Sequence, residues 1–407
     1  MVENDHAISD QFIQDQNLDD QKSIDERYMK RALSLALNGL GWTNPNPMVG
    51  AVIVKDGRII GEGWHTKSGQ LHAEREALAH CSEDPQGATL YVTLEPCCHW
   101  GKTPPCTDAI IEHKIARVVM GAPDPNPLVA GGGVAQLRNA GIEVTEGVLV
   151  PECCALNKVF FHFIQTKRPY VVAKYAMTLD GKIATKTGAS KWITGKAARA
   201  HVHVQRHCFA AIMVGVGTVL ADDPLLTCRL EEHEENLASW KTESPFREDP
   251  YPGIEQANNP VRVVLDSQLR IPLDSTLVKS AQDTPVVIAT VSQDKKRIAL
   301  LKNQGCEVLV TKENQGRVCL ENLLELLGER GLDSLYVEGG PTVHAALCEA
   351  GLIDEVHAYV APKIFGGVDA PGPVGGAGVQ TPGEALAFRR VTTHQLGQDF
   401  LFECEVN

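Results

Sequence analysis

The chain has 407 residues, of which 43% are hydrophobic and 22% charged, and its formal net charge at pH 7 is −13. This length favours two domains of about 150–200 residues each, and the composition is that of a soluble globular protein. The negative charge argues against a general nucleic-acid-binding protein, because such proteins usually carry an excess of basic residues.

The first 27 residues are acidic and polar, so they do not resemble a secretory signal. The longest weakly polar run, residues 209–221, is too short to span a bilayer. Twelve cysteines are scattered along the chain, which favours free thiols and metal ligands over disulfides. We therefore expect a cytoplasmic protein that binds neither membranes nor nucleic acids.

Residues 1–24 lack apolar periodicity and are predicted to form a mobile extension. From residue 25 to residue 150, helical and strand patterns alternate, which predicts an α/β sheet domain. The expected elements are a helix from about residue 25, a hairpin over 49–63, helices over 72–80, 107–113 and 133–140, and strands over 88–94, 117–121 and 142–148.

Residues 151–168 are predicted to form a linking helix, and residues 169–407 a second α/β domain. Residues 231–259 are polar and acidic without a clear period, so they are predicted to be a surface insertion. The expected strands of this domain are 170–176, 210–216, 261–266, 285–290, 307–311 and 334–337, with helices over 195–206, 320–330 and 343–350.

The most informative motif is His72-Ala-Glu74, followed by Pro96-Cys97 and then by Cys106. Histidine nitrogen and cysteine sulfur are zinc ligands, and a catalytic zinc ion has three protein ligands and one open position. Zinc nucleobase deaminases show the signature H-x-E…P-C-x-x-C. Here Trp100 occupies the place of the second cysteine, so the spacing becomes P-C-x8-C.

We expect His72, Cys97 and Cys106 to bind zinc, which would lower the pKa of a bound water molecule. Glu74 would take the proton of this water and return protons to the ammonia that leaves an amino-bearing ring. In the alternative interpretation, the zinc is structural and Cys98 or His99 supplies a fourth ligand, which would leave Glu74 without a role.

Two glycine-rich segments in the second domain, 214–218 (VGVGT) and 338–342 (EGGPT), follow predicted strands. Such strand ends can cradle a phosphate at a helix start, although two ordinary tight turns would have similar sequences. Arg206 and Arg229 could each bind a phosphate through two parallel hydrogen bonds, or could be solvated surface charges. Other polar residues near predicted strand ends or loops are Ser190, Trp192, Thr218, Asp222, Ser267 and Glu338.

Seven segments together resemble the family of bifunctional riboflavin-biosynthesis deaminases/reductases, in which the long cysteine spacing is normal. They are TNPNPMVG (43–50), HAE (72–74), LEPCCHWGKTPPC (94–106), KYAMTLDG (174–181), SKWIT (190–194), VLADDP (219–224) and VEGGPT (337–342). The resemblance covers about residues 25–405.

For the first domain, the resemblance implies a cytidine-deaminase-like three-layer α/β/α fold with one zinc ion per chain. His72, Cys97 and Cys106 would be its ligands, Glu74 the proton donor, and Asn46 a substrate-binding residue. The reaction would be hydrolytic deamination of 2,5-diamino-6-ribosylamino-4(3H)-pyrimidinone 5′-phosphate, with release of ammonia.

For the second domain, the resemblance implies a dihydrofolate-reductase-like fold that uses NADPH to reduce the ribose of 5-amino-6-(5-phosphoribosylamino)uracil. Lys174 would assist proton transfer or act as a cation in the pocket wall. Residues expected at NADP are Ala176, Trp192, Thr218, Asp222, Ser267, Gly340, Pro341, Thr342, Val343, His344, Ala345 and Ala346. Residues expected at the substrate are Ser190, Arg206, Leu226, Arg229 and Glu338.

Two other functions remain compatible with the zinc motif alone. A nucleic-acid-editing deaminase would need a basic face and a channel for a flipped base, which the net charge of −13 disfavours. A non-catalytic zinc-stabilised scaffold would not need Glu74. We further expect a homo-oligomer, because two-step enzymes with an open sheet edge often assemble.

Overall fold

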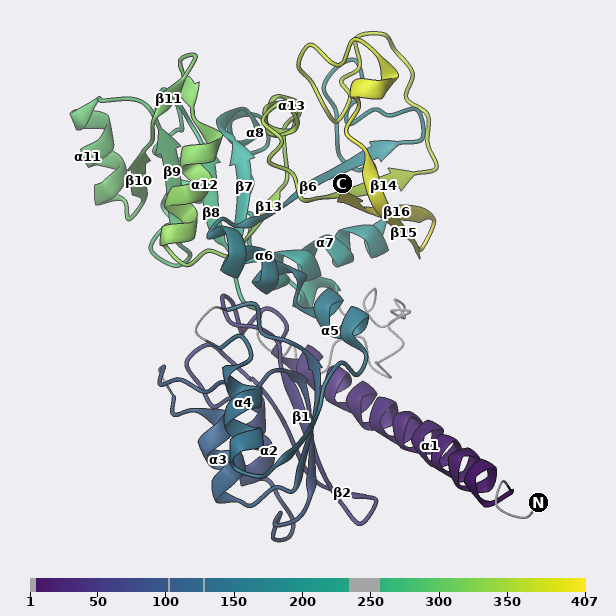
Figure 1. Ribbon diagram of the computed structural model, residues 1–407. Coiled ribbons are helices and arrows are strands. Elements are labelled where there is room, and N and C mark those ends of the chain that lie inside the picture. Colours follow the sequence, from purple (N-terminus) through teal and green to yellow (C-terminus); the bar gives the residue numbers. More distant parts are fainter. Residues whose placement is uncertain (1–4, 102, 127–128, 234–256) are drawn as a thin grey trace. The chain divides into compact units, whose positions relative to one another are not determined.

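The computed structural model describes the backbone of residues 5–101, 103–126, 129–233 and 257–407, and side chains from residue 20 onward except that of residue 233 (Figure 1). The chain divides into two compact units, with the division after Gln165. Most of the predicted insertion at 231–259 lies outside the described residues. Within the described residues, no helix is long and apolar enough to cross a membrane.

The first unit contains a five-stranded sheet whose central strand is buried on both faces. The strand order is β2 (Arg58–Trp64), β1 (Gly50–Lys55), β3 (Thr89–Leu94), β4 (Arg117–Ala122) and β5 (Glu143–Thr145). Strand β1 pairs antiparallel with both neighbours, whereas β3, β4 and β5 are parallel. The helices are α1 (Asp5–Ala36), α2 (Ala73–Ala79), α3 (Cys106–Glu112), α4 (Gly132–Asn139), α5 (Val150–Leu156) and α6 (Lys158–Thr166), with a 3₁₀ turn at Leu37–Gly39.

Glycines allow helices to lie directly against both faces of this sheet. A Cβ atom added to Gly50 would lie 1.9 Å from the carbonyl oxygen of Ala32 in α1. On the next strand, a Cβ atom added to Gly63 would lie 2.3 Å from the backbone nitrogen of Ala77 in α2. Because neighbouring residues of β1 point to opposite faces, and Gly63 pairs with the residue after Gly50, α1 and α2 cover opposite faces. This confirms the predicted three-layer arrangement.

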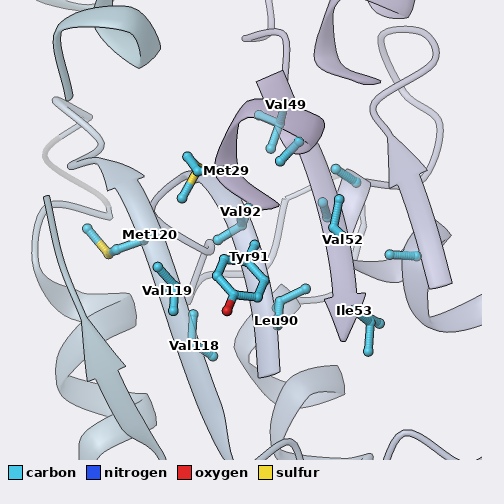
Figure 2. Close-up of a cluster of buried hydrophobic side chains, with 14 of the residues drawn as sticks. Met29, Val49, Val52, Ile53, Leu90, Tyr91, Val92, Val118, Val119 and Met120 are labelled. Carbon is cyan, nitrogen blue, oxygen red and sulfur yellow. The ribbon is translucent and has the colours of Figure 1, made fainter. Parts of the chain in front are cut away.

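The core of the first unit is made of the strand side chains and the apolar side of α1. Figure 2 shows Met29 of α1 with side chains of β1, β3 and β4, among them Val52, Leu90 and Val119. All four of these residues are fully buried. Successive side chains of these strands point to opposite faces of the sheet, and helices cover both faces. The strands are therefore continuous hydrophobic runs in the sequence.

Two predictions about helices differ from the structure. Helix α1 begins at Asp5, inside the predicted extension of residues 1–24, because polar residues with good helix propensity can lengthen a helix without an apolar stripe. The predicted linking helix over 151–168 is instead two helices, α5 and α6, which are interrupted at Asn157. The backbone of Asn157 departs from helical geometry, with φ −113° and ψ 24°.

The second unit contains a nine-stranded sheet that is parallel except at one edge. The strand order is β10 (Glu307–Val310), β9 (Val286–Thr290), β8 (Val261–Leu265), β7 (Ala211–Gly215), β13 (Ser334–Val337), β6 (Tyr170–Thr178), β14 (Glu355–Ala361), β16 (Asp399–Val406) and β15 (Phe388–Leu396). Strand β16 is antiparallel to both of its neighbours, β14 and β15. The predicted strands and helices of this domain are present, whereas β14, β15 and β16 were not predicted.

The helices of the second unit connect these strands and cover the sheet. They are α7 (Lys196–Cys208), α8 (Val216–Asp222), α10 (Thr276–Lys279), α11 (Lys295–Asn303), α12 (Leu320–Glu329) and α13 (Pro341–Glu349), with 3₁₀ turns at Glu231–His233 and Pro382–Glu384 and a small ladder of β11 (Glu313–Asn314) and β12 (Arg317–Val318). Met213 packs in one hydrophobic cluster and its neighbour Ile212 in another, so both sheet faces are buried. Both units therefore have the predicted α/β architecture.

Candidate active sites

Two helix starts and one loop bring the predicted zinc ligands together. His72 is the N-cap residue of α2, Cys97 lies in the loop after β3, and Cys106 is the first residue of α3. The amide of Cys106 donates a hydrogen bond to the carbonyl of Cys97, at 3.0 Å, which fixes the loop between the two thiols. The ligand atoms of the three residues all lie within 4.8 Å of one another.

The distances between these atoms fit a tetrahedral zinc site. The Nδ1 atom of His72 lies 3.5 Å from Sγ of Cys97 and 3.4 Å from Sγ of Cys106. Zinc bonds of about 2.0 Å to nitrogen and about 2.3 Å to sulfur at a tetrahedral angle would place such atoms about 3.5 Å apart. The other ring nitrogen of His72 lies 3.4 Å from Oγ1 of Thr103, which orients the ring.

The alternative of a four-ligand structural site is not supported by the arrangement. Among the described residues, the possible metal-binding group at this place consists of His72, Cys97 and Cys106 alone. The sulfur of Cys98 points toward Gly132, where an added Cβ atom would lie 2.8 Å from it. His99 lines the neighbouring cavity. Three protein ligands leave the fourth zinc position open, as in catalytic zinc sites.

Glu74 is buried next to this group, with 3% of its surface exposed. His72 has extended backbone angles, φ −77° and ψ 161°, and lies just outside the regular part of α2. The angle that a regular helix sets between residues two positions apart therefore does not separate the side chains of His72 and Glu74. Burial raises the pKa of Glu74, and the negative charge of Cys97 raises it further. The pKa of Cys97 itself falls to about 4, because the Cys106 thiol and the His72 ring donate hydrogen bonds to it.

Three of the four residues of the motif, His72, Glu74 and Cys97, border a cavity of about 1000 Å³, including its open mouth. Asn46, the predicted substrate residue, lines the cavity, and its side-chain nitrogen lies 3.3 Å from Nε2 of His65. Burial lowers the pKa of His65, which favours the neutral ring. Residues that line the cavity but were not assigned to it from sequence include Pro47, His65, Gln70, Glu95, Thr103, Asp124, Asn126 and Phe160.

Two carboxylates that line the cavity, those of Glu95 and Asp124, were not assigned to a site from the sequence. Glu95 accepts hydrogen bonds from the amides of Gly131, Gly133 and Val134 and thereby holds the start of α4. Asp124 follows β4, and burial raises its pKa to about 6. Their positions directly after strands were the only signal in the sequence, because the carboxyl ends of parallel strands meet at one edge.

In the second unit, three predicted residues form one buried charge cluster. Glu338 accepts hydrogen bonds from Nε and Nη2 of Arg206, at 2.7 and 3.0 Å. The Nζ atom of Lys174 lies 3.6 Å from the same carboxylate and 5.7 Å from the centre of the Tyr359 ring. Tyr359 was not predicted, because nothing in its local sequence marks it as a neighbour of Lys174.

The pKa values of this cluster follow from burial and charge. Burial alone would raise the pKa of Glu338, but the charges of Arg206 and Lys174 lower it to about 2. Burial lowers the pKa of Lys174, against the opposing effect of Glu338. The Nε–Nη2 edge of Arg206 is occupied by Glu338, so the predicted pair of hydrogen bonds to a phosphate through this edge would require Arg206 to leave the carboxylate.

Other predicted residues lie at the carboxyl ends of the parallel strands. Thr218 is in α8 after β7, and an added Cβ atom on Gly340 would lie 3.8 Å from its hydroxyl oxygen. The amide of Gly215 donates to the carbonyl of Gly339 at 3.0 Å, so the two glycine-rich segments are neighbours. Ser267 follows β8 and accepts a hydrogen bond from the amide of Val318.

These strand ends fit a phosphate-bearing cofactor. Helix α13 begins after Gly340 without a side-chain cap, and α8 begins after Gly215 in the same way. Uncapped helix starts beside glycine-rich backbone are suited to bind phosphate. Of the residues predicted to bind NADP, Pro341, Thr342, Val343, His344, Ala345 and Ala346 form the first two turns of α13, Asp222 ends α8, and Ala176 lies in β6.

The remaining predicted residues lie in loops around this edge. Trp192 is 64% exposed and stacks on Arg199, whose guanidinium carbon lies 4.4 Å from the ring centre. Arg229 is bound to Glu232 at 3.2 Å and donates to Thr227, which also accepts from Arg206. Leu226 is buried, and no contact joins Ser190 to the cluster around Glu338 within the described part of the chain.

Two family models match the chain. The model of the cytidine and deoxycytidylate deaminase zinc-binding region matches residues 22–122, and that of the RibD C-terminal domain matches residues 169–402. The riboflavin biosynthesis protein RibD of Actinobacillus pleuropneumoniae is 52% identical over 379 residues, which cover 93% of this chain and 94% of the relative. RibD of Escherichia coli is 40% identical, over 92% of this chain and 97% of the relative.

A solved structure supports the same relationship. The diaminohydroxyphosphoribosylaminopyrimidine deaminase/5-amino-6-(5-phosphoribosylamino)uracil reductase of Thermotoga maritima is 40% identical to this chain. The comparison covers 95% of this chain and 100% of that structure, with a TM-score of 0.79.

Proposed function

The chain belongs to the RibD family, whose members combine a deaminase and a reductase of riboflavin biosynthesis, and we propose which residues carry each step. It is a bifunctional enzyme with a zinc-binding deaminase domain and a reductase domain. Its substrates are small pyrimidine compounds. The individual site residues, the exact substrates and the choice of NADPH belong to the proposal.

In the proposed deaminase site, His72, Cys97 and Cys106 hold zinc. Zinc held by these residues would lower the pKa of a water molecule and make it a nucleophile near neutral pH. Glu74 takes the proton from this water and delivers protons to the amino group that leaves as ammonia. The buried position of Glu74 supports this role, because a raised pKa allows a carboxylate to accept and donate protons near neutral pH.

The proposed deaminase substrate is 2,5-diamino-6-ribosylamino-4(3H)-pyrimidinone 5′-phosphate, and the product is 5-amino-6-(5-phosphoribosylamino)uracil. Asn46 binds the pyrimidine in the cavity that also contains His72 and Glu74. A cavity that excludes bulk water strengthens these polar contacts. The single observation that carries this proposal is that three possible zinc donors lie within 4.8 Å of one another, beside a cavity that the buried Glu74 also lines.

In the proposed reductase site, NADPH would supply the hydride that reduces the ribose to a ribityl chain. Lys174 transfers a proton to the opened sugar, and the lowered pKa that burial gives it supports this role. Glu338 contacts the sugar and is held in place by Arg206. Arg229 binds the substrate phosphate, and the uncapped start of α13 receives a phosphate of NADPH.

The test is a coupled assay on the phosphorylated diaminopyrimidinone with and without NADPH. We expect ammonia release in both cases and NADPH oxidation only after deamination has occurred. Ammonia release without any NADPH oxidation would overturn the assignment of the second site. Failure to release ammonia from this substrate would overturn the assignment of the first.

The choice of cofactor and the assembly state need separate measurements. Replacing NADPH by NADH in the same assay is expected to lower kcat/KM, because NADH lacks the phosphate that distinguishes NADPH. We also propose that the protein is a cytoplasmic homo-oligomer. Sedimentation equilibrium would test the oligomer and cell fractionation the location.

A further inference from the structure

Asn157 makes a paired contact with a residue far from it in the sequence. The amide of Met48 donates a hydrogen bond to Oδ1 of Asn157 at 2.8 Å, and Nδ2 of Asn157 donates to the carbonyl of Met48 at 2.9 Å. The two residues are 109 positions apart. Only 3% of Asn157 is exposed, whereas Met48 is half-buried, so the two hydrogen bonds are partly shielded from water.

The side chain of Asn157 thus makes with Met48 the same pair of hydrogen bonds that the backbone of a neighbouring strand would make. An amide side chain offers one acceptor and two donors, which match the amide and carbonyl of one backbone residue. The backbone of Asn157 is itself fixed, since its amide donates to Cys154 and its carbonyl accepts from Phe161. These bonds hold the backbone from which the side chain reaches Met48.

Both partners of this contact carry parts of the deaminase cavity. Asn46 and Pro47 immediately precede Met48, and both line the cavity. Phe160, three residues after Asn157 in α6, lines the same cavity. Phe160 is almost fully buried, with 8% exposed. One buried amide therefore joins the loop that holds Asn46 to the helix that supplies an aromatic wall.

We propose that Asn157 is a positioning residue of the deaminase, which sets the place of Asn46 and Phe160 in the substrate cavity. This proposal rests on the proposed deaminase function. The matched zinc-binding region ends at residue 122, so the contact brings a segment outside it into the active site. The segment between the two matched regions is then part of the deaminase and not a spacer.

The contact predicts an effect on substrate binding that is separate from the chemical step. Asn157 and Met48 are not among the three predicted zinc ligands. The two hydrogen bonds described above join Asn157 and Met48 to each other and do not involve Glu74. Loss of the contact would free the loop with Asn46 while zinc and the proton carrier stay in place. The Michaelis constant would then change more than kcat.

The experiment uses the full-length enzyme with the substitutions Asn157→Asp and Asn157→Leu. Aspartate keeps the volume and the acceptor but places a carboxylate oxygen against the Met48 carbonyl. Leucine removes both hydrogen bonds. Asn139→Asp, at the exposed end of α4, is the matched control. Ammonia release gives KM and kcat, while zinc content and reductase activity on the deaminated substrate report the integrity of each site.

For Asn157→Asp we expect KM to rise about tenfold, because the half-buried carbonyl of Met48 loses its donor, with kcat changed by less than about twofold. Zinc content and reductase activity should equal those of the control. Phe160→Leu should raise KM in the same direction. If Asn157→Leu does not fold, Asn157→Asp decides the question because it preserves the volume.

An unchanged KM in Asn157→Asp would overturn the proposal. So would a loss of zinc, or a fall in kcat as large as the rise in KM, since Asn157 would then maintain the fold of the unit. Measurement of the wild-type enzyme distinguishes failure of the proposed role of Asn157 from failure of the proposed deaminase function. If it releases no ammonia from the diaminopyrimidinone phosphate, the proposed deaminase function itself fails.

Discussion

Arg206 and Glu338 form a buried pair joined by two hydrogen bonds, at 2.7 and 3.0 Å. Their side chains are 11% and 9% exposed, respectively. Lys174 shares the same carboxylate at 3.6 Å, so one negative charge balances two positive charges in the second unit. A cluster of this kind is sensitive to the loss of its central carboxylate.

The first prediction concerns the removal of that carboxylate. Glu338→Gln should destabilise the second unit by about 3–5 kcal/mol, because two buried cations lose their counter-charge. Urea unfolding followed by a probe in that unit would measure the change. The control is Glu307→Gln, which breaks an exposed pair with Arg330 and should have a much smaller effect. Equal effects of the two substitutions would contradict the prediction.

The second prediction is the pH dependence of the same unit. The pKa of Glu338 is about 2 in the folded state and 4.5 when unperturbed, so folding favours its ionised form. Its stabilising contribution is complete above pH 4.5 and is lost as the pH falls toward 2. The shift corresponds to a difference on the order of 3 kcal/mol. Unfolding free energies measured between pH 5 and about 2 should therefore fall more steeply for wild type than for Glu338→Gln.

A third prediction separates proton transfer from metal binding. Glu74→Gln should lower ammonia release by about 10²–10⁴-fold, because an amide cannot carry the proton. Zinc content and reductase activity on the deaminated substrate should remain at wild-type levels. Glu76→Gln, in the same helix but outside the cavity, is the control. Full deaminase activity in Glu74→Gln would favour a scaffold role for the zinc site.

The fourth prediction concerns the zinc ligands. Cys106→Ser should reduce the zinc content well below one ion per chain, because a serine hydroxyl is a poor replacement for a thiolate. Chelation of the wild-type enzyme should likewise stop ammonia release and leave the reductase active. Cys98→Ser should retain zinc, since Cys98 is not in the ligand group. Zinc loss in Cys98→Ser would indicate a fourth ligand.

The fifth prediction tests the packing of α1 on the sheet. Gly50→Ala would place a methyl group 1.9 Å from the carbonyl oxygen of Ala32, a backbone atom that cannot move alone. We expect a loss of stability of at least about 2 kcal/mol in the first unit. Gly101→Ala, which meets no atom within 4 Å, is the control in thermal unfolding. A small effect at residue 50 would mean that α1 can shift away from the sheet.

Much of the architecture could be predicted from local patterns. The strands at β3 and β13 and the helices α2, α3 and α12 were expected within one or two residues, because their apolar periodicity is clear. The strands β14, β15 and β16 were missed. Strand β15 is exposed along most of its length, so it shows little of the apolar alternation that identifies a strand.

The sequence by itself predicted a donor set for zinc and a residue suited to move protons, and the structure brings these side chains together. His72, Glu74, Cys97 and Cys106 are recognisable because zinc binds histidine nitrogen and cysteine sulfur, and because the His-Ala-Glu and Pro-Cys segments follow the signature of zinc deaminases. The same is true of the family, whose motifs occur in both halves.

Only the tertiary structure decided which distant side chains complete each site. Phe160 lines the cavity three residues after Asn157, whose side chain bonds Met48, 109 residues away. Arg206 is paired with Glu338 across 132 residues and is not a free surface charge. Neither relationship has a local signal, because hydrogen bonds and charges between remote segments depend on how the strands and helices pack together.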